Sequence, residues 1–244
     1  MEKILALSDP HYNHNWTDEK TQRFYRDFEP EDLTALVIAG DISDSYDYAQ
    51  DFLGFFKDWK AKKYFVPGNH CYGWGEHSYN NRSGTCIHKL AETSGFIVPD
   101  CDELYVVKDD VLLFNLFYRP GITEEQITDT SDHLDFPIRN YMMRPDMSKI
   151  KTDSNVRFSV SHLAPNTGIP SRHIVRSPMF YNPDIDEIAR AHQSKLEIFG
   201  HTHEEVDCVI DGVRYVNKPA GYGRPRGKLE DYIITVQNQD SVFK

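Results

Sequence analysis

The chain has 244 residues, of which 39% are hydrophobic and 27% are charged. This composition is ordinary for a globular protein, and the length suits one large domain or one domain with an insertion. No stretch approaches the roughly 20 apolar residues that a membrane-spanning helix needs. Lysine and arginine total 27 against 38 acidic residues, a net charge of −11, which argues against binding of extended nucleic acid through a basic surface.

The N-terminal sequence leads directly from Met1 into an apolar strand pattern, with no room for a signal peptide. We therefore expect a cytoplasmic protein with reduced thiols. None of the four cysteines belongs to a C-x-x-C pair, which argues against a zinc ribbon or a thioredoxin-like motif. We interpret the cysteines as small, partly buried apolar residues.

The first 70 residues alternate between apolar and amphipathic segments. Strands are predicted at 4–7, 33–39 and 63–66, and helices at 17–28 and after Ser45. The second helix has an apolar face made of Tyr48, Phe52, Phe55, Phe56 and Trp59. This order predicts right-handed crossovers and a parallel sheet, in which sites form beyond the carboxyl ends of the strands.

The pattern changes after residue 70. A helix is predicted at 86–93, and another one opens at Asn182-Pro183. Further strands are predicted at 104–107, 111–117, 157–160, 196–199, 206–210, 213–216 and 232–236. Two of these form a hairpin around Asp211-Gly212. Residues 120–155 are polar, and we expect them to form an insertion or cap over the site in a single domain spanning residues 1–244.

Five of the predicted strands end in polar motifs. In chain order these are Asp9-x-His11, Gly40-Asp41, Gly68-Asn69-His70, His162 and Gly200-His201-Thr202-His203. Imidazole nitrogens and carboxylate oxygens suit zinc, iron and manganese. A carboxylate such as Asp41 can bridge two ions, and ions about 3.5–4 Å apart can hold a phosphoryl group and activate a bound water or hydroxide. The glycines allow tight turns and close approach of the backbone.

This ordered set of motifs, from residue 9 to residue 203, resembles the signature of the calcineurin-like metallophosphoesterases. The resemblance implies an α/β fold, the four-layer αββα sandwich of two mixed β-sheets flanked by helices. Within the superfamily, the chain resembles most a bacterial and phage-associated subgroup of unassigned activity. The shared features include Val66-Pro67-Gly68-Asn69-His70 and the stretch Asn217 to Tyr222. They support the chemistry but name no substrate.

The resemblance also implies a role for each polar residue of the motifs. The first of two divalent metal ions would be bound by Asp9, His11 and His203. The second would be bound by Asn69, His162 and His201. Asp41 would bridge the two. We expect manganese first, although the same ligand set accepts iron, zinc or nickel.

Two further residues have implied catalytic roles without binding metal. His70 would stabilise charge on the substrate phosphate and protonate the leaving oxygen, and Asp44 would hold His70 in position. The chain departs from many relatives at Cys71, where they have an acidic residue. We expect this thiol to pack inertly. The remaining histidines are interpreted as structural (His14, His77, His88, His133 and His192), and His173 stays undecided.

The predicted function is metal-dependent hydrolysis of a phosphodiester or phosphomonoester, with a small nucleotide-like substrate favoured. Arginines and aromatic residues in the loops could grip a second anion or stack on a base. Substrate contacts are assigned to Arg119, Arg172 and Tyr72, against the alternative of solvated arginines and a packed ring. Other interpretations are a non-catalytic metal-binding scaffold and a nuclease for short single strands. The oligomeric state and the physiological substrate stay open.

Overall fold

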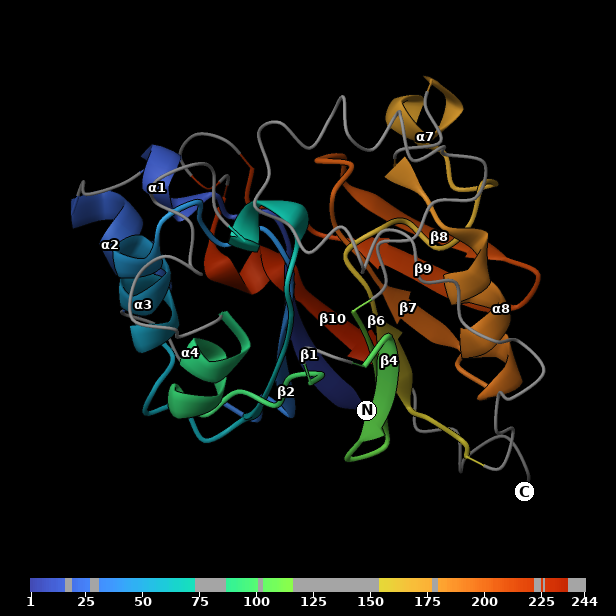
Figure 1. Cartoon of the computed structure of the whole chain (residues 1–244), viewed down its shortest axis with the longest axis horizontal. Coiled ribbons are helices and arrows are strands. Elements are labelled where there is room, and N and C mark those ends of the chain that lie inside the picture. Colours follow the sequence, from blue (N-terminus) through green and yellow to red (C-terminus); the bar gives the residue numbers. More distant parts are fainter. Residues whose placement is uncertain are drawn as a thin grey trace.

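The computed structural model describes residues 1–15, 19–26, 31–72, 87–100, 103–115, 154–176, 180–221, 225 and 227–236. Two β-sheets pack face to face, and helices cover their outer sides (Figure 1). This arrangement confirms the predicted αββα sandwich. Most of the predicted insertion, residues 120–153, lies outside the described residues, so the insertion stays a prediction.

The first sheet has the strand order β10-β1-β2-β3. Its parallel strands are β1 (Glu2–Leu7), β2 (Ala35–Ala39) and β3 (Lys62–Val66), and β10 (Ile233–Val236) runs antiparallel beside β1. Its outer face is covered by α2 (Glu19–Arg26), α3 (Tyr46–Gly54) and α4 (Ile87–Thr93) (Figure 1). The short helix α1 (Tyr12–Asn15) follows β1. The parallel pairing of β1, β2 and β3 is the one expected from the alternating pattern.

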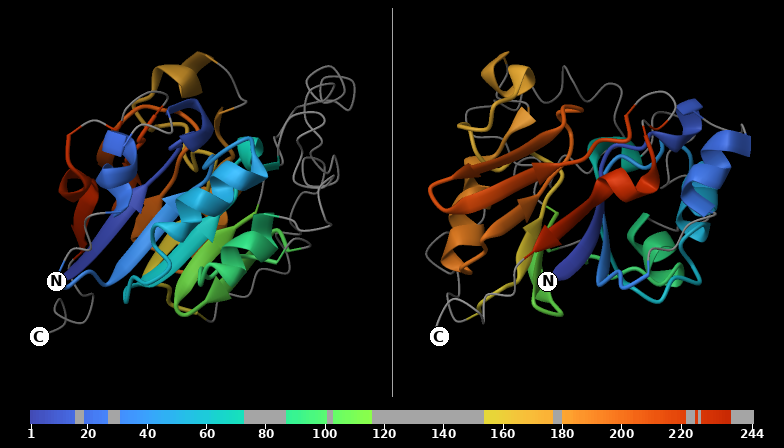
Figure 2. Two further views of the ribbon diagram at one scale, coloured as in Figure 1. Left: turned by 90° about the vertical axis from the view of Figure 1, so that its left-hand side faces the viewer. Right: turned by 180° about the vertical axis from the view of Figure 1, so that it is seen from behind.

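The second sheet has the strand order β4-β5-β6-β7-β9-β8. Its strands are β4 (Tyr105–Lys108), β5 (Val111–Phe114), β6 (Phe158–Val160), β7 (Leu196–Ile198), β8 (Val206–Ile210) and β9 (Val213–Asn217). The four central strands are parallel, and an antiparallel hairpin closes each edge. Helix α8 (Pro183–Ala191) covers its outer face (Figure 2), and α7 (Arg172–Arg176) lies at one end.

The main core lies between the two sheets. Successive residues of β1 point to opposite sides, so that Ile4 and Ala6 face the second sheet while Leu5 and Leu7 face the helices. All four side chains are at most 1% exposed. Burial on both faces explains why these strands are continuous apolar runs rather than alternating ones.

Several predicted elements differ from the structure at their ends. Helix α3 stops at Gly54, before the predicted end near Trp59. The chain then continues in tighter turns, in which the amides of Phe55 and Phe56 donate to carbonyls three residues earlier. Phe56 and Trp59 stay buried, so the apolar spacing marked the buried face correctly but not the helix end. Helices α1 and α7 were not predicted.

Among the described residues, no helix is long and apolar enough to cross a membrane.

Candidate active site

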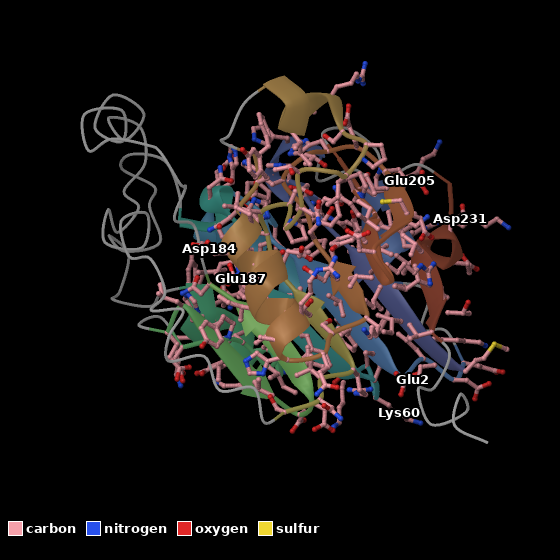
Figure 3. The ribbon with its side chains drawn as sticks, turned by 90° about the vertical axis from the view of Figure 1, so that its right-hand side faces the viewer. Glu2, Lys60, Asp184, Glu187, Glu205 and Asp231 are labelled. Carbon is pink, nitrogen blue, oxygen red and sulfur yellow. The ribbon has the colours of Figure 1, made fainter. Side chains whose placement is uncertain are left out.

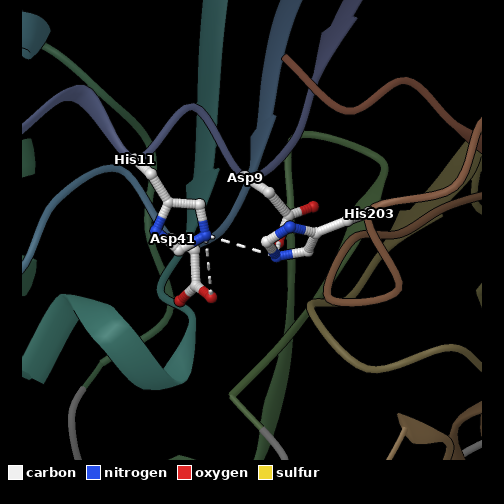
Figure 4. Close-up of side chains that lie close together, drawn as sticks. All are labelled: Asp9, His11, Asp41 and His203. Carbon is white, nitrogen blue, oxygen red and sulfur yellow. Dashed lines mark hydrogen bonds and ion pairs between the residues drawn. The ribbon is translucent and has the colours of Figure 1, made fainter. Parts of the chain in front are cut away.

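The five polar motifs meet at one end of the sandwich. Each lies in the loop after a parallel strand: β1, β2 and β3 in the first sheet, and β6 and β7 in the second. Because the loops from both sheets converge (Figure 4), side chains that are up to 194 residues apart, Asp9 and His203, become neighbours. The site therefore lies where the loops of the two sheets meet.

The first group of candidate ligands is Asp9, His11, Asp41 and His203. One ligand atom of each lies within 4.8 Å of the others. The Nε2 atoms of His11 and His203 are 3.3 Å apart, and Asp41 Oδ2 lies 3.8 Å from His11 Nε2 (Figure 4). Asp9, His11 and Asp41 are almost fully buried, whereas the His203 side chain is 27% exposed. The group therefore forms a buried cluster of potential metal-binding atoms that is open to solvent on the side of His203.

The second group shares Asp41 and adds His162 and His201. His162 Nε2 lies 3.3 Å from Asp41 Oδ2 and 3.1 Å from the amide oxygen of Asn69. Asn69 therefore faces this group. Asp41 is the one carboxylate common to both groups, the position that a bridging ligand requires.

The donor chemistry of the second group fits a cation. His162 Nδ1 donates to the carbonyl of Ala39 at 3.0 Å, which directs Nε2 toward two oxygen acceptors, those of Asn69 and Asp41. Three acceptor atoms at one buried point repel each other unless a proton or a metal ion lies between them. Burial lowers the pKa of His162, but the charge and hydrogen bond of Asp41, the charge of Asp9 and the Ala39 carbonyl together outweigh burial and raise that pKa to about 9. Nitrogen and carboxylate donors in this arrangement suit a divalent transition metal.

Backbone amides hold the two carboxylates in place. The amide of His201 donates to both oxygens of Asp9, at 2.9 and 3.0 Å. The amide of His70 donates to Asp41 Oδ1 at 2.8 Å, which leaves Oδ2 directed at the histidines. Such outer contacts orient metal ligands before any ion binds.

Most of the candidate ligands have an unusual backbone conformation. Five of them have a positive φ, a conformation that few non-glycine residues adopt: Asp9 (49°), His11 (40°), Asp41 (49°), His201 (66°) and His203 (54°). Each such residue costs about 1–2 kcal/mol. Strain of this kind gathers at functional sites, where the surrounding structure enforces it.

The three glycines of the motifs make room for the ligands. A Cβ at Gly40 would lie 2.1 Å from His162 Nδ1, and one at Gly68 would lie 2.1 Å from Asp41 Oδ1. At Gly200, a Cβ would lie 2.4 Å from the carbonyl oxygen of Ala39. All three distances are far shorter than contact distance, so each position needs glycine for the close approach expected from the sequence.

His70 lies beside the first group, in the short 3-10 helix η1 (Asn69–Tyr72). Its Nδ1 donates to Asp44 Oδ1 at 2.6 Å, and its ring meets the His11 ring edge-on with centroids 4.9 Å apart. Burial lowers the pKa of His70, but the hydrogen bond to Asp44 and the charges of Asp41 and Asp44 together outweigh burial, so the net shift is upward. The structure thus brings Asp44 into contact with the His70 ring.

Two residues that the sequence analysis did not assign to the site hold Asp44. Its Oδ2 accepts from Asn13 Nδ2 at 2.9 Å and lies 2.9 Å from His14 Nε2. His14 was interpreted as structural, but here it touches the partner of His70. The available signal was its place three residues after His11, but only the turn of α1 brings it back to Asp44.

The predicted substrate contacts are only partly described. Arg172 begins α7 with a side chain that is 81% exposed, and its Nε donates to Glu204 Oε1 at 2.8 Å. Arg119 and the side chain of Tyr72 lie outside the described residues. Cys71 is fully buried, and burial raises the pKa of its thiol, which fits inert packing.

Comparison with known proteins identifies the family. The sequence profile of the calcineurin-like phosphoesterases matches residues 2–205. The chain therefore belongs to the calcineurin-like phosphoesterases, a metal-dependent family of hydrolases.

One solved structure supports the fold, and two others are weaker matches. A phosphopantetheinyl hydrolase from Mycobacterium tuberculosis is 16% identical and has a TM-score of 0.57, over 91% of this chain and 90% of that one. A putative 5'-nucleotidase from Staphylococcus aureus is 14% identical with a TM-score of 0.48, over 88% of this chain and 48% of that one. An archaeal phosphodiesterase is 15% identical with a TM-score of 0.40, over 88% and 82%. No curated protein matches the chain.

Proposed function

We propose that the chain hydrolyses a small phosphate ester, with a nucleotide-like phosphodiester ahead of a monoester, and uses two divalent metal ions. Manganese is the first choice of metal. The observation that carries this proposal is the pair of donor groups joined by Asp41, with the His70–Asp44 pair beside them. We further propose that the protein works in the cytoplasm.

The metal ligands are proposed in two sets that share Asp41. Asp9, His11 and His203 hold one ion. Asn69, His162 and His201 hold the other. When bound, the two ions supply positive charge for the phosphoryl oxygens and lower the pKa of water. The amide contacts to Asp9 and Asp41 keep the carboxylates in position for this purpose.

His70 is proposed to donate a proton to the leaving oxygen. The carboxylate of Asp44 can only accept, so the contact at Nδ1 fixes the ring tautomer and makes Nε2 the nitrogen that exchanges protons with the substrate. A poor leaving group needs this proton most, because the bond to it breaks with charge building on oxygen. The upward pKa shift of His70 keeps the proton available. A diester with an alcohol leaving group therefore suits the site.

The proposal is tested by a paired assay. Manganese-loaded protein is compared on bis-p-nitrophenyl phosphate, p-nitrophenyl phosphate and phenyl phosphate, with His70→Gln and Asp41→Asn. The matched control is His192→Gln, at the end of α8, whose ring contacts Ser154. We expect His70→Gln to lose about 10²–10⁴-fold in kcat, with a larger loss on a phenyl than on a p-nitrophenyl leaving group. An equal loss in kcat for both leaving groups would show that His70 is not the acid. Manganese-independent turnover would overturn the metal-based function.

A further inference from the structure

A cavity of about 340 Å³ opens among residues from both sheets, and its lining differs in charge from the chain as a whole. It is lined by Met1, Arg157, Lys195, Leu196, Arg214, Thr235 and Val236. Three of these side chains are cationic and none is acidic, although the whole chain has a net charge of −11. The size lies at the lower end of the range for small-molecule sites, about 300–1,000 Å³.

This cavity is far from the candidate active site. Arg157 and Lys195 directly precede β6 and β7, whereas the candidate ligands follow the same strands. The cavity therefore lies at the opposite end of the sandwich. Figure 3 shows this separation, because Glu2, which pairs with Arg157, lies at the end away from Glu205, which follows the ligand loop.

The two guanidinium groups are held in fixed positions. Arg157 donates to Glu2 Oε2 and to the Tyr64 hydroxyl, both at 3.3 Å. Arg214 forms a two-pronged pair with Asp207, at 2.8 and 2.7 Å, and donates to the carbonyl of Thr235 at 2.9 Å. A guanidinium has five N–H donors, so these contacts occupy only part of each group. Donors fixed in advance lose little entropy when a ligand binds.

The charges and the apolar wall together define a ligand class. Glu2 and Asp207 offset the two arginine charges in part, and the exposed Lys195 adds a third cation. Forked guanidinium groups match the oxygens of phosphate better than a single ammonium does. Leu196 and Val236 offer apolar surface on the same lining, which suits a small apolar group attached to the anion.

We propose that this cavity is a second ligand site, which binds a compact phosphorylated molecule with a small apolar group. Because forked guanidinium donors match phosphate oxygens and Lys195 adds a cation beyond the two arginine–carboxylate pairs, a phosphate monoester suits the cavity better than a single carboxylate. The ligand is held but not hydrolysed there, since the candidate metal ligands are at the other end. The proposal does not depend on the proposed hydrolysis.

The test is a residue-resolved NMR titration of the full chain with phenylphosphonate, whose carbon–phosphorus bond resists hydrolysis. Spectra are recorded for the protein as purified and with a chelator, so that shifts near the metal ligands are separated from shifts at Lys195, Leu196 and Thr235. Inorganic phosphate, which lacks the ring, is titrated in parallel. We expect saturable shifts at the cavity in both conditions, with tighter binding of phenylphosphonate than of phosphate.

Three variants are expected to differ in their affinity for phenylphosphonate. Lys195→Glu should weaken binding about tenfold because it reverses the charge of the exposed cation. Glu2→Gln should tighten binding a few-fold, because Arg157 loses its competing carboxylate. Lys57→Glu, an equal charge change at an exposed position outside the cavity, should leave the dissociation constant unchanged. No saturable shift at the cavity up to about 10 mM, or equal affinity in Lys195→Glu and Lys57→Glu, would overturn the proposal.

Discussion

Asp41 is the residue on which the two halves of the candidate site depend. One of its oxygens accepts from the His70 amide at 2.8 Å, and the other faces His11 and His162. The same carboxylate therefore links the proposed metal ligands to the loop that presents the proposed acid. The space for this contact exists only because residue 68 is a glycine.

We predict that Gly68→Ala lowers kcat/KM by at least about 100-fold, since a shift of about 1 Å in a catalytic group has an effect of that size. A Cβ there would lie 2.1 Å from Asp41 Oδ1 and must displace it. Gly54→Ala is the matched control, because its Cβ would meet no atom within 4 Å. Steady-state kinetics and thermal melts of both variants check this prediction. Full activity of a folded Gly68→Ala chain would show that the site tolerates the displacement.

We predict that Asn13 and His14 position the acid through Asp44. Removing either contact, in Asn13→Ala or His14→Ala, lets the Asp44 carboxylate rotate and weakens its 2.6 Å bond to His70. The expected loss in kcat is about tenfold, larger for poor leaving groups, with unchanged metal content. The measurement is the leaving-group dependence of kcat in both variants. A loss that is the same for every leaving group would indicate a purely structural role.

The sequence indicated the candidate ligands but not the residues that lie behind them. Asp9 and His203 could be assigned because each stands in a motif with a chemical meaning. Asn13 and His14 could not, since a single asparagine or histidine is usually structural and only the fold places them on Asp44. The left-handed backbone of the ligands is likewise a product of tertiary contacts, which no local pattern records.

At the scale of elements, a polar cluster joins β7, β9 and α8. Tyr215 donates to Asp186 at 2.5 Å, and Arg190 bonds both oxygens of Asp186 at 3.0 Å and contacts the Tyr215 hydroxyl at 2.7 Å. Glu197, in β7, is 1% exposed. Burial and the nearby charge of Asp186 raise its pKa well above the usual range for glutamate. The folded protein therefore holds Glu197 in its neutral form at mildly acidic pH.

This shift predicts a pH dependence of stability. The folded chain keeps a proton on Glu197 where the unfolded chain has lost it, so stability falls as pH rises from the ordinary glutamate range through the raised pKa. Glu197→Gln has no proton to lose, and we expect its stability to fall less between about pH 5 and 8. Urea unfolding across this range checks the slope, with the exposed Glu187→Gln as control. Parallel slopes for Glu197→Gln and the native chain would contradict the prediction.

Element order was easier to predict than element ends. Apolar runs in β1, β2 and β3 follow from burial on both faces, which their composition records. The end of α3 at Gly54 could not be read from its apolar spacing, because the tighter turns after it keep Phe56 in the core. The short helix α7 carries too few residues to show a periodic pattern.

At the scale of the whole molecule, the proposed metal ions would tie the two sheets together. Asp9 and Asp41 follow strands of the first sheet, whereas His162 and His201 follow strands of the second. An ion bound by residues from both sheets stabilises the folded chain by about 2.7 kcal/mol when its concentration is a hundredfold above its Kd. For a chain of this size, that corresponds to a rise in Tm of about 5–10 °C. Thermal melts with manganese and with a chelator measure it, and Asp41→Asn should reduce the difference. Equal Tm values with and without metal would contradict the prediction.

The most direct test of a two-metal centre is the number of ions per chain. Metal-stripped protein is dialysed against manganese, and bound metal is counted by mass spectrometry for the native chain, His203→Ala, His201→Ala and Asp41→Asn. The two-site arrangement predicts two ions in the native chain, one after either histidine substitution, and weakened binding of both in Asp41→Asn. A native chain that binds one ion or none, or histidine variants that keep two, would contradict the arrangement on which the proposed phosphoesterase activity rests.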